Sequence, residues 1–424
     1  MMIFKFGGAS VRDADAVRNV GQILDLFKGN DLVVVVSAMG KTTNALEKVV
    51  ASHLAADGQA LVWLNEVRTF HLDIMSGLFP DLKHPVYAAV ENYLLEIEWV
   101  LDEEPRQADF TYDQIVGFGE LISTTIVSAY LNDSGTLNRF VDIRDCLLSD
   151  NTYREARIDW KESERKTREV ISRSMESGNH VVVTQGFIAA SSENFTTTLG
   201  REGSDYTAAI LAHLLNAESV TIWKDVPGVL NADPKFYTDA QKLEQISYTD
   251  AIELAYYGAS VIHPKTIKPL ENKGIPLYVK SFLNPQGKGT VIGKDLQTKP
   301  QVPSFIFKNN QVLLSLSSRD FSFIAEDNLS DIFAQFASQG VRINLMQNSA
   351  ISFSVCFDHE DSRTENLIES LRSHYRVRYN TGVQLCTIRH YYPSTIDTIT
   401  QGNEVLLEQR SRTTAQLVLK AIQE

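Results

Sequence analysis

The chain opens with Met2-Ile-Phe-Lys5-Phe6-Gly7-Gly8-Ala9-Ser10, and this stretch indicates its fold. A short apolar run ends in two glycines, and helical spacing begins soon after, near Asp13. Glycines let a backbone approach a ligand closely, and N–H groups at a helix start attract phosphate oxygens. The stretch therefore predicts a strand that turns directly into a helix. The turn is either a phosphate site with Lys5 as a point charge or a plain tight turn with a surface lysine. It lacks the G-x-x-x-x-G-K-[ST] pattern of a P-loop.

The same alternation of short apolar runs and helical spacing continues through the first two thirds of the chain. Further strands are predicted at Leu32–Ser37, His180–Gln185, Ser219–Trp223 and Pro276–Lys280. Helices are predicted at Ala14–Phe27 and Tyr206–Leu215, and an all-helical insertion at Trp63–Leu101. Apolar strands alternating with helices imply an α/β fold with a mostly parallel open sheet between helix layers.

Turn-rich segments at 284–290 and 299–303 mark a boundary, after which the pattern changes. Residues 311–379 read as βαββαβ, an α+β unit. A shorter echo begins at Val383, with a brief helix from Ser394, and it lacks room for a last helix and strand. We therefore expect domains at 1–295, 303–382 and 383–424, the last one incomplete or completed by a neighbouring molecule.

Composition excludes several classes of function. The 424 residues carry a net charge of −13 without basic runs, which argues against nucleic-acid binding. The longest apolar runs, such as Leu32–Val36, are too short to cross a bilayer, and Lys5 interrupts the first one, so neither a membrane span nor a secretory signal is expected. Three cysteines without metal-type spacing fit a reducing cytoplasm.

Two polar segments follow predicted strands or open helices. Ser37-Ala-Met-Gly-Lys-Thr-Thr43-Asn44 comes directly after a strand, at the sheet edge where open α/β folds bind ligands. Its hydroxyls could hold a carboxylate, or it could be a plain loop. Gly117-Phe-Gly-Glu120 opens a helix, where Glu120 could bind a cation or only complement the helix dipole.

The most informative stretch is Thr196-Thr-Thr-Leu-Gly-Arg201-Glu-Gly-Ser204-Asp205. It leads into an amphipathic helix, for which Ser204 is the predicted N-cap. An arginine fork beside a helix N-terminus is a strong receptor for a carboxylate or a phosphate. Asp205 could orient a lysine or an ammonium. Capping alone does not explain Arg201 preceded by three threonines, so a binding site is favoured here.

Two further segments carry turn chemistry. Lys224-Asp225-Val-Pro-Gly-Val-Leu230 follows a strand and continues to Asp233-Pro-Lys235. Gly258-Ala-Ser260-Val-Ile-His263-Pro264 ends one helix and starts the next, and His263 is more readily explained as a capping or packing group than as a catalyst.

Taken together, these motifs resemble the aspartate kinases. The resemblance rests on five of them, which occur in the family's order between residue 2 and about residue 293: Lys5-Phe-Gly-Gly, Phe118-Gly-Glu120, Thr197-Thr-Leu-Gly-Arg201 with Gly203-Ser-Asp205, Asp225-Val-Pro-Gly with Asp233-Pro, and Gly258-Ala with His263-Pro264. The resemblance implies the amino-acid kinase fold for residues 1–295 and paired ACT modules, small βαββαβ units that bind amino-acid effectors, in the C-terminal part. No homoserine dehydrogenase module follows in the sequence, so the chain looks like the monofunctional form.

The implied reaction transfers the γ-phosphoryl group of ATP to the β-carboxylate of L-aspartate, the first step of lysine, threonine and methionine biosynthesis. Catalysis then consists of positioning and charge neutralisation, because the acceptor carboxylate is already ionised at pH 7. The resemblance assigns catalysis to Lys5, Arg201 and Asp205, and places Mg²⁺ on ATP, with Asp205 either holding Lys5 or helping to organise the metal. The implied aspartate-binding residues are Ser37, Thr43, Glu120, Arg201 and Ser204, with Arg201 on the α-carboxylate and Glu120 on the ammonium. The implied ATP-binding residues are Lys5, Gly7, Gly8, Lys224, Asp225, Leu230, Lys235 and Ser260.

Several positions depart from the common family pattern. Departures stand at Ala9, Glu202, Lys224, Leu230, Lys235 and Ser260, where threonine, glycine, a small hydroxyl residue, an aromatic, an arginine and a lysine are frequent. Most of them fall on the nucleotide side. Lys224 and Lys265 are candidates to replace a missing cation, and the carboxylate of Glu202 could compete with substrate for Arg201 unless it points to solvent.

The regulatory part resembles the family's effector pocket at Ser318, Asp320, Phe321, Asn344, Gln347 and Asn348. Lysine or threonine is the implied effector, although Asn344 replaces an aspartate common in lysine-responsive members. A homodimer or higher homo-oligomer through the ACT units is expected, because a half-built unit leaves strand edges to be covered. Two alternatives stay open. One is another carboxylate kinase of the same fold, such as glutamate 5-kinase or acetylglutamate kinase, and the other is a catalytically weak amino-acid sensor.

Overall fold

The computed structural model describes residues 1–176, 178, 180–259, 262–320 and 322–422. These residues form two compact units. The first comprises residues 1–229, 242–252 and 261–299, and the second comprises 230–241, 253–260 and 300–424. The boundary near residue 300 lies where the turn-rich segments predict it. Two short segments from the predicted catalytic part, 230–241 and 253–260, group with the second unit.

Runs of β-branched and aromatic residues form the centre of the first unit's sheet. β1 (Met2–Phe6), β2 (Leu32–Val36) and β4 (Val181–Gln185) are parallel and almost wholly buried, as expected for strands covered on both faces. The eight strands lie in the order β3-β4-β2-β1-β7-β9-β10-β8. The other strands of this sheet are β3 (Arg139–Val141), β7 (Ser219–Lys224), β8 (Gln245–Ser247), β9 (Leu277–Ser281) and β10 (Thr290–Gly293). Only the β9–β10 pair is antiparallel, so the predicted α/β fold with a mostly parallel sheet is confirmed.

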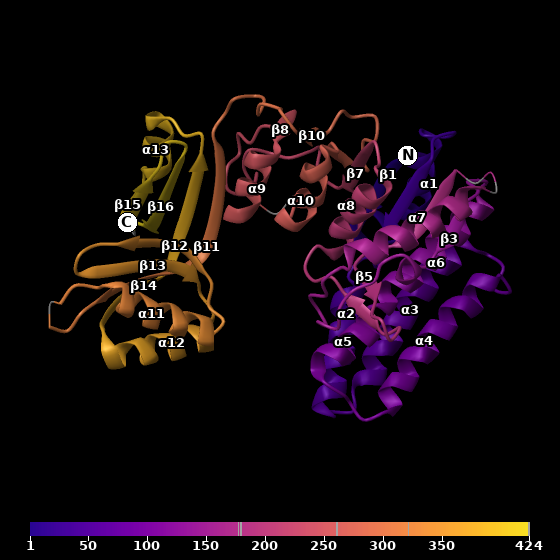
Figure 1. Ribbon diagram of the computed structural model, residues 1–424, viewed down its shortest axis with the longest axis horizontal. Helices are drawn as coiled ribbons and strands as arrows, with labels where there is room; N and C mark the ends of the chain where they lie inside the picture. Colours follow the sequence, from indigo (N-terminus) through magenta and orange to yellow (C-terminus); the bar gives the residue numbers. More distant parts are fainter. Residues whose placement is uncertain (177, 179, 260–261, 321, 423–424) are drawn as a thin grey trace. The chain divides into compact units, whose positions relative to one another are not determined.

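Helices connect the strands (Figure 1). Asp13 is the N-cap of α1, and its side chain accepts a hydrogen bond from the N–H of Ala16. The helices of this unit are α1 (Ala14–Asp25), α2 (Thr42–Ala55), α3 (Ala60–Leu78), α4 (Pro85–Asp102), α5 (Ala108–Val116), α6 (Phe118–Asp133), α7 (Trp160–Glu176), α8 (Gly203–Leu215), α9 (Tyr248–Tyr257), which runs on into the second unit's residues, and α10 (Pro264–Lys273). Short 3-10 turns lie at Gly8–Val11 and Ile143–Asp145, and a hairpin is formed by β5 (Ile188–Ala190) and β6 (Thr196–Thr198).

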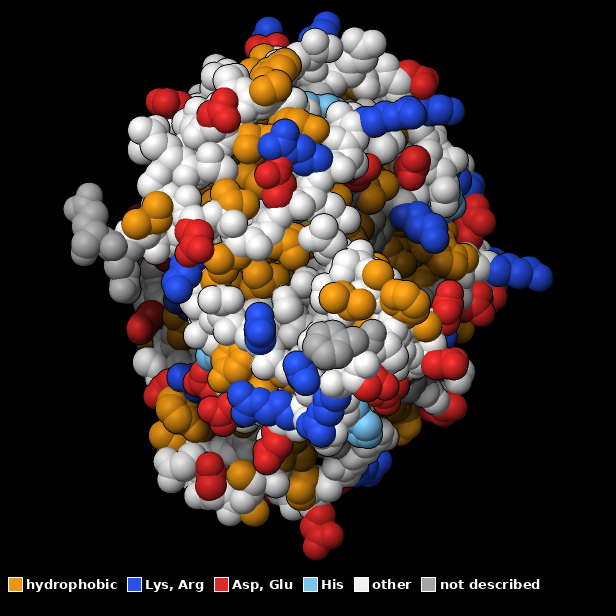
Figure 2. All heavy atoms as spheres, turned by 90° about the vertical axis from the view of Figure 1, so that its left-hand side faces the viewer, with side chains coloured by type: hydrophobic (Ala, Val, Ile, Leu, Met, Phe, Trp, Pro, Cys, Tyr) orange, Lys and Arg blue, Asp and Glu red, His pale blue; other side chains and the backbone are white. Residues whose placement is uncertain are grey.

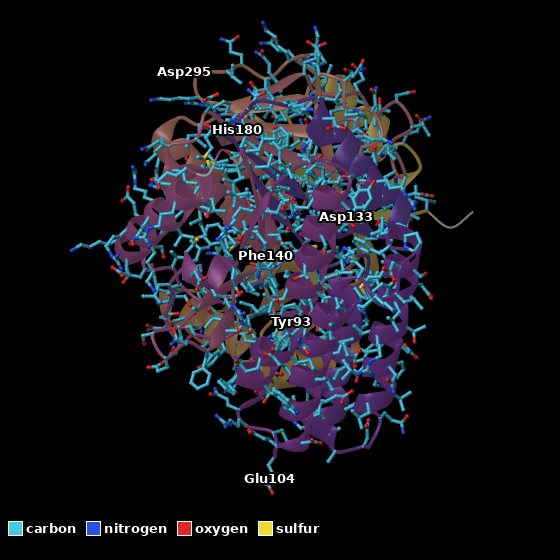
Figure 3. The ribbon with its side chains drawn as sticks, turned by 90° about the vertical axis from the view of Figure 1, so that its right-hand side faces the viewer. Tyr93, Glu104, Asp133, Phe140, His180 and Asp295 are labelled. Carbon is cyan, nitrogen blue, oxygen red and sulfur yellow. The ribbon has the colours of Figure 1, made fainter. Side chains whose placement is uncertain are left out.

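The predicted helical insertion is present as α3 and α4, which pack side by side. Glu104, in the connection after α4, points into solvent at one end of this helical layer, and His180, just before β4, lies toward the other end (Figure 3). The stretch Ala108–Asp133 is long and apolar enough to cross a membrane by length and composition, which the short apolar runs did not suggest. However, 78% of its most apolar window is buried inside the protein, as in the core helices of many globular proteins.

The second unit is built on one antiparallel sheet of six strands in the order β12-β13-β11-β14-β16-β15. The strands are β11 (Ser304–Ser317), β12 (Ile343–Asn348), β13 (Ser352–Asp358), β14 (Arg376–Arg389), β15 (Asn403–Arg410) and β16 (Thr414–Ala421). The helices are α11 (Glu326–Ser338), α12 (Asp361–His374) and α13 (Pro393–Thr400). α11 and α12 cover a core that includes Leu314, Phe336 and Phe357. This completes the βαββαβ unit predicted between residues 311 and 379.

The echo that follows shares its sheet with the first half. β11 and β14 are each 14 residues long and serve both halves of the sheet. The first half of β11, Ser304–Lys308, pairs with the end of β14 and supplies a strand that the sequence from residue 383 onward lacks. Side chains from residues 230–241, including Ala232 and Tyr237, pack on this half beside Phe305. The strand that the second half was expected to lack is therefore supplied from before the first half, whereas the described residues after 383 contain one helix, α13, and no second one.

Candidate active site

The carboxyl ends of three central strands open into one cavity of about 780 Å³. Phe6 of β1, Val36 of β2 and Gln185 of β4 lie in register, so the loops that follow them start at the same edge of the sheet. The cavity brings together seven residues predicted from the sequence: Lys5, Gly8, Ser37, Thr43, Glu120, Arg201 and Ser204. They come from positions almost 200 residues apart, and parallel strands are what unite them.

At the inner wall of the cavity, Lys5 forms an ion pair with Asp205. Lys5 Nζ lies 2.5 Å from Asp205 Oδ1, and Asp205 is fully buried in the first turn of α8. Burial alone would raise the pKa of Asp205, but the ammonium groups of Lys5 and Lys224 hold it below its usual value. Asp205 therefore carries a charge and fixes the Lys5 ammonium. Gly7 makes this position possible, because a Cβ there would lie 3.3 Å from Lys5 Nζ.

Glu120 is a buried carboxyl group with unused hydrogen-bonding capacity. Its Oε1 accepts a hydrogen bond from the N–H of Ala38 at 3.3 Å, whereas Oε2 is buried without a partner among the described residues. Burial raises the pKa of Glu120 to about 8, against a smaller opposing effect of Lys5. A buried carboxyl with a free oxygen in a cavity wall is a receptor for a cation, and ionising it requires one nearby.

Arg201 and Ser204 lie at the start of α8. Arg201 is exposed to the cavity and lies in the turn that follows β6. The prediction that Ser204 caps this helix is wrong. The N-cap is Glu202, whose φ of 55° is left-handed, and Ser204 already lies inside the helix. Gly186 lies so close to Ser204 that a Cβ on Gly186 would be 2.5 Å from the Ser204 side chain. Glu202 is exposed at the same cavity.

The loop after β2 is held against the turn after β1. The N–H of Gly40 donates to the carbonyl of Gly8 at 3.0 Å, and a Cβ on Gly8 would lie 2.7 Å from the Gly40 carbonyl. Ser123 of α6 donates to the carbonyl of Ser37 at 2.7 Å. These contacts need a glycine at position 8 and keep Ser37 and Thr43 at the cavity.

Sequence reasoning missed Tyr112 and Arg154, which line the cavity, and Asp113, which is bonded to Arg154. Asp113 is buried in α5 and accepts hydrogen bonds from Arg154 N, Thr198 N and Thr198 Oγ1. Burial raises its pKa to about 6 against these hydrogen bonds. It thereby ties the loop at Arg154 and the strand that leads to Arg201 to one helix. The only sequence signal was an acidic residue within an amphipathic helix, which is more often exposed.

Arg154 and Tyr112 line the cavity next to Asp113. The Arg154 guanidinium lies 4.2 Å from the ring centroid of Tyr112, and Tyr112 donates to Glu47 Oε1 at 2.9 Å. All three line the cavity. Arg154 adopts a left-handed φ of 66°, a conformation that nothing in its sequence neighbourhood predicted.

The predicted nucleotide residues are only partly brought together. Lys224, at the end of β7, reaches Asp205 Oδ2 at 3.6 Å, and Asp225 next to it is exposed. Leu230 and Lys235 belong to the second unit, where the N–H of Lys235 donates to Asp233. Ser260 lies outside the described residues. His263 is confirmed as a cap, since its Nδ1 accepts from the N–H of Lys265.

The predicted effector residues divide between two places in the second unit. Ser318 and Asp320 line a cavity of about 520 Å³, together with Asp327, Asp331 and other residues. Asn344, Gln347 and Asn348 lie on β12 and are not among the described residues that line this cavity. Asn344 accepts a hydrogen bond from Lys308 Nζ and donates to Gln311, each at 2.8 Å. Phe321 lies outside the described residues.

The described part of the chain contains no group of three or more His, Cys, Asp or Glu side chains placed to hold a metal ion. Both oxygens of Asp205 face lysine ammonium groups, which leaves this carboxylate poorly suited as a direct metal ligand.

The arrangement favours a small dianionic amino acid and an anionic donor. Arg201 can bind one carboxylate, Glu120 can bind an ammonium, and Lys5 can neutralise an anion at the inner wall. An ionised carboxylate attacks without a general base, so the groups needed are cations and positioning contacts.

Comparisons with known proteins agree with this chemistry. Residues 1–281 match the amino acid kinase family. The chain is 31% identical to lysine-sensitive aspartokinase 3 of Escherichia coli over 399 residues, covering 92% of this chain and 86% of that protein. It is 30% identical to chloroplastic aspartokinase 1 of Arabidopsis thaliana, covering 88% of this chain and 66% of that protein.

Solved structures extend the similarity to the whole chain. The structure of E. coli aspartokinase III with lysine and aspartate (T-state) matches with a TM-score of 0.83 at 27% identity, covering 99% of this chain and 95% of that one. The complex of the same enzyme with aspartate and ADP (R-state) matches with a TM-score of 0.80, covering 99% and 96%.

Proposed function

Because this chain belongs to the amino acid kinase family, and within it to the aspartokinases, we propose that it transfers the γ-phosphoryl group of ATP to the β-carboxylate of L-aspartate. It is an ATP-dependent carboxyl kinase of amino-acid biosynthesis, and its product is 4-phospho-L-aspartate. The observation that carries the proposal is the single cavity lined by Lys5, Glu120 and Arg201. These side chains match the three charged groups that aspartate and a transferred phosphoryl group present.

In the proposed mechanism, Arg201 binds the α-carboxylate of aspartate in a fork, assisted by hydroxyl groups of Ser204 and Thr43. The buried Oε2 of Glu120 accepts a hydrogen bond from the substrate ammonium. The β-carboxylate is thereby directed toward Lys5, whose ammonium is fixed by Asp205. Lys5 neutralises charge on the phosphoryl group as it is transferred, which is the main electrostatic task in phosphoryl transfer.

We place the nucleotide at the turn of Gly7 and Gly8 and at the end of β7. The backbone N–H groups of the short 3-10 turn at Gly8–Val11 suit phosphate oxygens. Mg²⁺ is proposed to bind through the phosphates of ATP, because the described residues offer no protein cage for it. When bound, it supplies charge neutralisation between phosphate oxygens.

The proposal is tested by incubating the chain with Mg-ATP and hydroxylamine, and with either aspartate or glutamate. An acyl phosphate reacts with hydroxylamine to give a hydroxamate, which is measured by its coloured iron complex. We expect hydroxamate with aspartate and at least about tenfold less with glutamate, because one extra methylene misplaces the carboxylate. Equal turnover of glutamate would favour another carboxylate kinase of this fold. Absence of product with either would favour an amino-acid sensor.

Feedback regulation by an amino acid is proposed for the second unit. The cavity at Ser318 and Asp320 also contains Asp327 and Asp331, and this acidic lining suits an effector that carries an ammonium group. Lysine and threonine are to be titrated separately into the assay. Inhibition by either supports an effector site, and a charge-neutralising Asp327→Asn change should weaken inhibition by lysine more than inhibition by threonine. If neither inhibits, this unit does not sense these two amino acids.

Self-association is proposed through β12, which is an outer strand of the second sheet. Met346 on this strand is 51% exposed and nearby Ile351 is 49% exposed. Hydrophobic side chains stand between basic and acidic ones on the face drawn in Figure 2. An edge strand with exposed apolar side chains is a template for pairing with a second copy. A cytoplasmic location, as for a biosynthetic enzyme, stays a prediction.

A further inference from the structure

The first unit contains a second cavity, which borders the same helix and strand as the cavity of Lys5 and Arg201. Its volume is about 370 Å³, and its lining comes mainly from α4, α5 and the hairpin of β5 and β6. This volume lies within the range of about 300–1,000 Å³ that is usual for small-molecule sites. We call it the rear cavity and the other one the active-site cavity. Among the described residues, no side chain lines both.

α5 separates the two cavities. A helix turns by about 100° per residue, so Phe110 and Gln114 share one face and Tyr112 lies on the opposite one. Phe110 and Gln114 line the rear cavity, and Tyr112 lines the active-site cavity. β6 also borders both, because Thr196 lines the rear cavity and Thr198, two residues later, lines the active-site cavity.

Two consecutive side chains of α5 bind β6. Gln114 Nε2 donates to the carbonyl of Thr196 at 2.8 Å, and the N–H of Thr196 donates to Gln114 Oε1 at 3.3 Å. Asp113 accepts from the N–H of Thr198 at 2.8 Å. Thr198 lies three residues before Arg201. A molecule that contacts Gln114 and Thr196 in the rear cavity therefore acts on the strand that leads to Arg201.

Aromatic side chains form much of the rear cavity's lining. They are Trp99, Phe110, Phe118 and Phe195. Trp99 is 66% exposed and Phe195 is 37% exposed, and the ring centroids of Phe110 and Phe195 lie 5.1 Å apart. Exposed rings beside a cavity are suited to packing against the ring of a ligand.

Two polar groups of the same lining lack partners. Thr111 is 2% exposed, and its hydroxyl makes no hydrogen bond to any residue that the structure describes. The Nε2 atom of His53 is buried and likewise has no partner among these residues. Buried polar groups in proteins are nearly always hydrogen-bonded, so the two groups indicate that a polar molecule completes this site.

Charged groups of the lining define that molecule further. Arg144 Nη1 donates to Thr196 Oγ1 at 3.0 Å, while its Nε and Nη2 donate to Asp142. A guanidinium group has five N–H donors, so donors remain for a ligand carboxylate. Exposed carboxylates that suit an ammonium group also line the cavity: Glu96, Glu103 and Glu104, the last of which points into solvent (Figure 3).

A ring, a carboxylate and an ammonium group together describe an aromatic amino acid. We propose that the rear cavity binds an aromatic amino acid and that its occupation strengthens aspartate binding in the active-site cavity. A ligand that binds the arrangement in which Gln114 and Asp113 bind β6 favours that arrangement, and Arg201 follows β6 directly. The second half of the proposal rests on the proposed function, because it assumes that aspartate binds beside Arg201.

The test is calorimetry on the full chain with L-phenylalanine, in the absence of aspartate and ATP. We expect a dissociation constant of about 1 mM or tighter. L-Leucine lacks the ring, 3-phenylpropionate lacks the ammonium, and phenethylamine lacks the carboxylate, so each should bind at least about tenfold more weakly. Absence of saturable binding by phenylalanine, tyrosine and tryptophan would overturn the proposal, and so would equal affinity for leucine.

Variants locate the binding. Trp99→Ala removes an exposed ring and should weaken phenylalanine binding by about tenfold, and Thr111→Val should weaken it by about fivefold. Trp160→Ala, on α7 and outside the described lining of both cavities, is the matched control and should bind like the wild type. Unchanged affinity in Trp99→Ala and Thr111→Val would place phenylalanine elsewhere in the protein and overturn the assignment.

The effect on aspartate is measured by the same method. With phenylalanine at saturation, the dissociation constant of aspartate should fall by about fivefold in the wild type, and the fall should need higher phenylalanine concentrations in Trp99→Ala. An unchanged or higher dissociation constant would overturn the coupling. If aspartate alone does not bind, the proposed function fails instead, and the phenylalanine titrations still test the rear cavity.

Discussion

The ammonium group of Lys5 is held by a buried carboxylate at a glycine turn, and it faces the cavity that also contains Arg201 and Glu120. Lys5 is thus fixed before any ligand arrives, so it needs no rearrangement as charge develops on the transferred group. Such preorganised charges act mainly on the transition state.

Lys5→Ala is therefore expected to lower kcat far more than it weakens binding. A fall of about 100-fold or more in kcat, with KM for aspartate changed less than about fivefold, is the expected steady-state result. Asp205 loses its nearest counter-charge in this variant, so its thermal unfolding should be measured alongside. Turnover like that of the wild type would remove Lys5 from the catalytic role.

Replacing Arg201 with lysine keeps the positive charge but changes the hydrogen-bonding geometry. A guanidinium group binds a carboxylate through two parallel hydrogen bonds, whereas an ammonium group acts as a point charge. Arg201→Lys should therefore raise KM for aspartate by about tenfold or more, with a smaller effect on KM for ATP. If KM for aspartate stays the same, Arg201 does not contact the substrate.

The raised pKa of Glu120 should make aspartate binding depend on pH. In the free protein burial raises its pKa to about 8, so near pH 7 it is mostly protonated, and binding a substrate ammonium requires it to lose that proton. KM for aspartate should fall about tenfold per pH unit between pH 6 and 8 and level off above it. Aspartate binding at pH 7 should also release a proton, which calorimetry in buffers of different ionisation enthalpy detects.

Glu120→Gln provides the control for this prediction, since it keeps the shape of the side chain but cannot titrate. The variant should bind aspartate weakly at all pH values and release no proton on binding. The pKa of Glu120 is also higher in the folded protein, about 8, than its ordinary value of 4.5. The contribution of its protonated form to folding stability is therefore complete below about pH 4.5 and is lost as pH rises to about 8. If KM for aspartate in the wild-type protein does not change with pH, the proposed contact between Glu120 and the substrate ammonium is contradicted.

At the scale of elements, the start of α8 decides where Arg201 lies. The helix follows directly on the close approach of Gly186 to Ser204, and its N-cap residue, Glu202, is forced into a left-handed conformation. Left-handed φ values are unfavourable for residues with a Cβ, and glycine adopts them without this cost.

Glu202→Gly is therefore expected to stabilise the protein slightly. The strain relieved is about 1 kcal/mol, partly offset by the greater freedom of glycine in the unfolded chain. Chemical denaturation should show an equal or higher midpoint with unchanged slope. The variant also removes a carboxylate beside Arg201, so KM for aspartate should stay the same or fall. A clear loss of stability would show that the Glu202 side chain makes a contact important to this turn.

The elements also show what sequence could and could not predict. The cavity residues after β1 and β2 were found because each motif adjoins a strand, and parallel strands end at a common edge. Arg201 was found because its motif leads into a helix, where an arginine favours binding of an anion. Tyr112 and Arg154 were missed because they line the cavity through the contact of the Arg154 loop with Asp113 of α5, which no local pattern specifies. Ser204 was misassigned as a cap because the helix begins one residue earlier, after a left-handed Glu202, a conformation that a glutamate does not signal in the sequence. Similarly, the pairing of Ser304–Lys308 with the end of β14 is long-range and leaves no local signal.

At the scale of the whole molecule, the proposed catalytic residues Lys5, Arg201 and Asp205 belong to one unit and the predicted effector residues to the other. The predicted nucleotide segment is divided, since Lys224 and Asp225 belong to the first unit and Leu230 and Lys235 to the second.

Self-association supplies a prediction at this scale. Met346→Lys places a charge on the exposed outer strand β12, where charged side chains oppose edge-to-edge pairing. The dissociation constant of the oligomer, measured by analytical ultracentrifugation, should be at least about tenfold higher for the variant than for the wild type. Val405→Lys, on β15 at the other edge of the same sheet, is the matched control and should not change the assembly. A wild-type protein that stays monomeric would exclude this interface.

The central claim is that Lys5 and Arg201 act on the two ends of one aspartate molecule. A crystal structure of the chain with aspartate and ADP tests it most directly. The claim predicts an α-carboxylate bound by the Arg201 guanidinium, an ammonium beside Glu120, and a β-carboxylate directed at the Lys5 ammonium with the nucleotide phosphates beyond it. Aspartate bound elsewhere, or bound with Lys5 and Arg201 contacting different ligands, would contradict it.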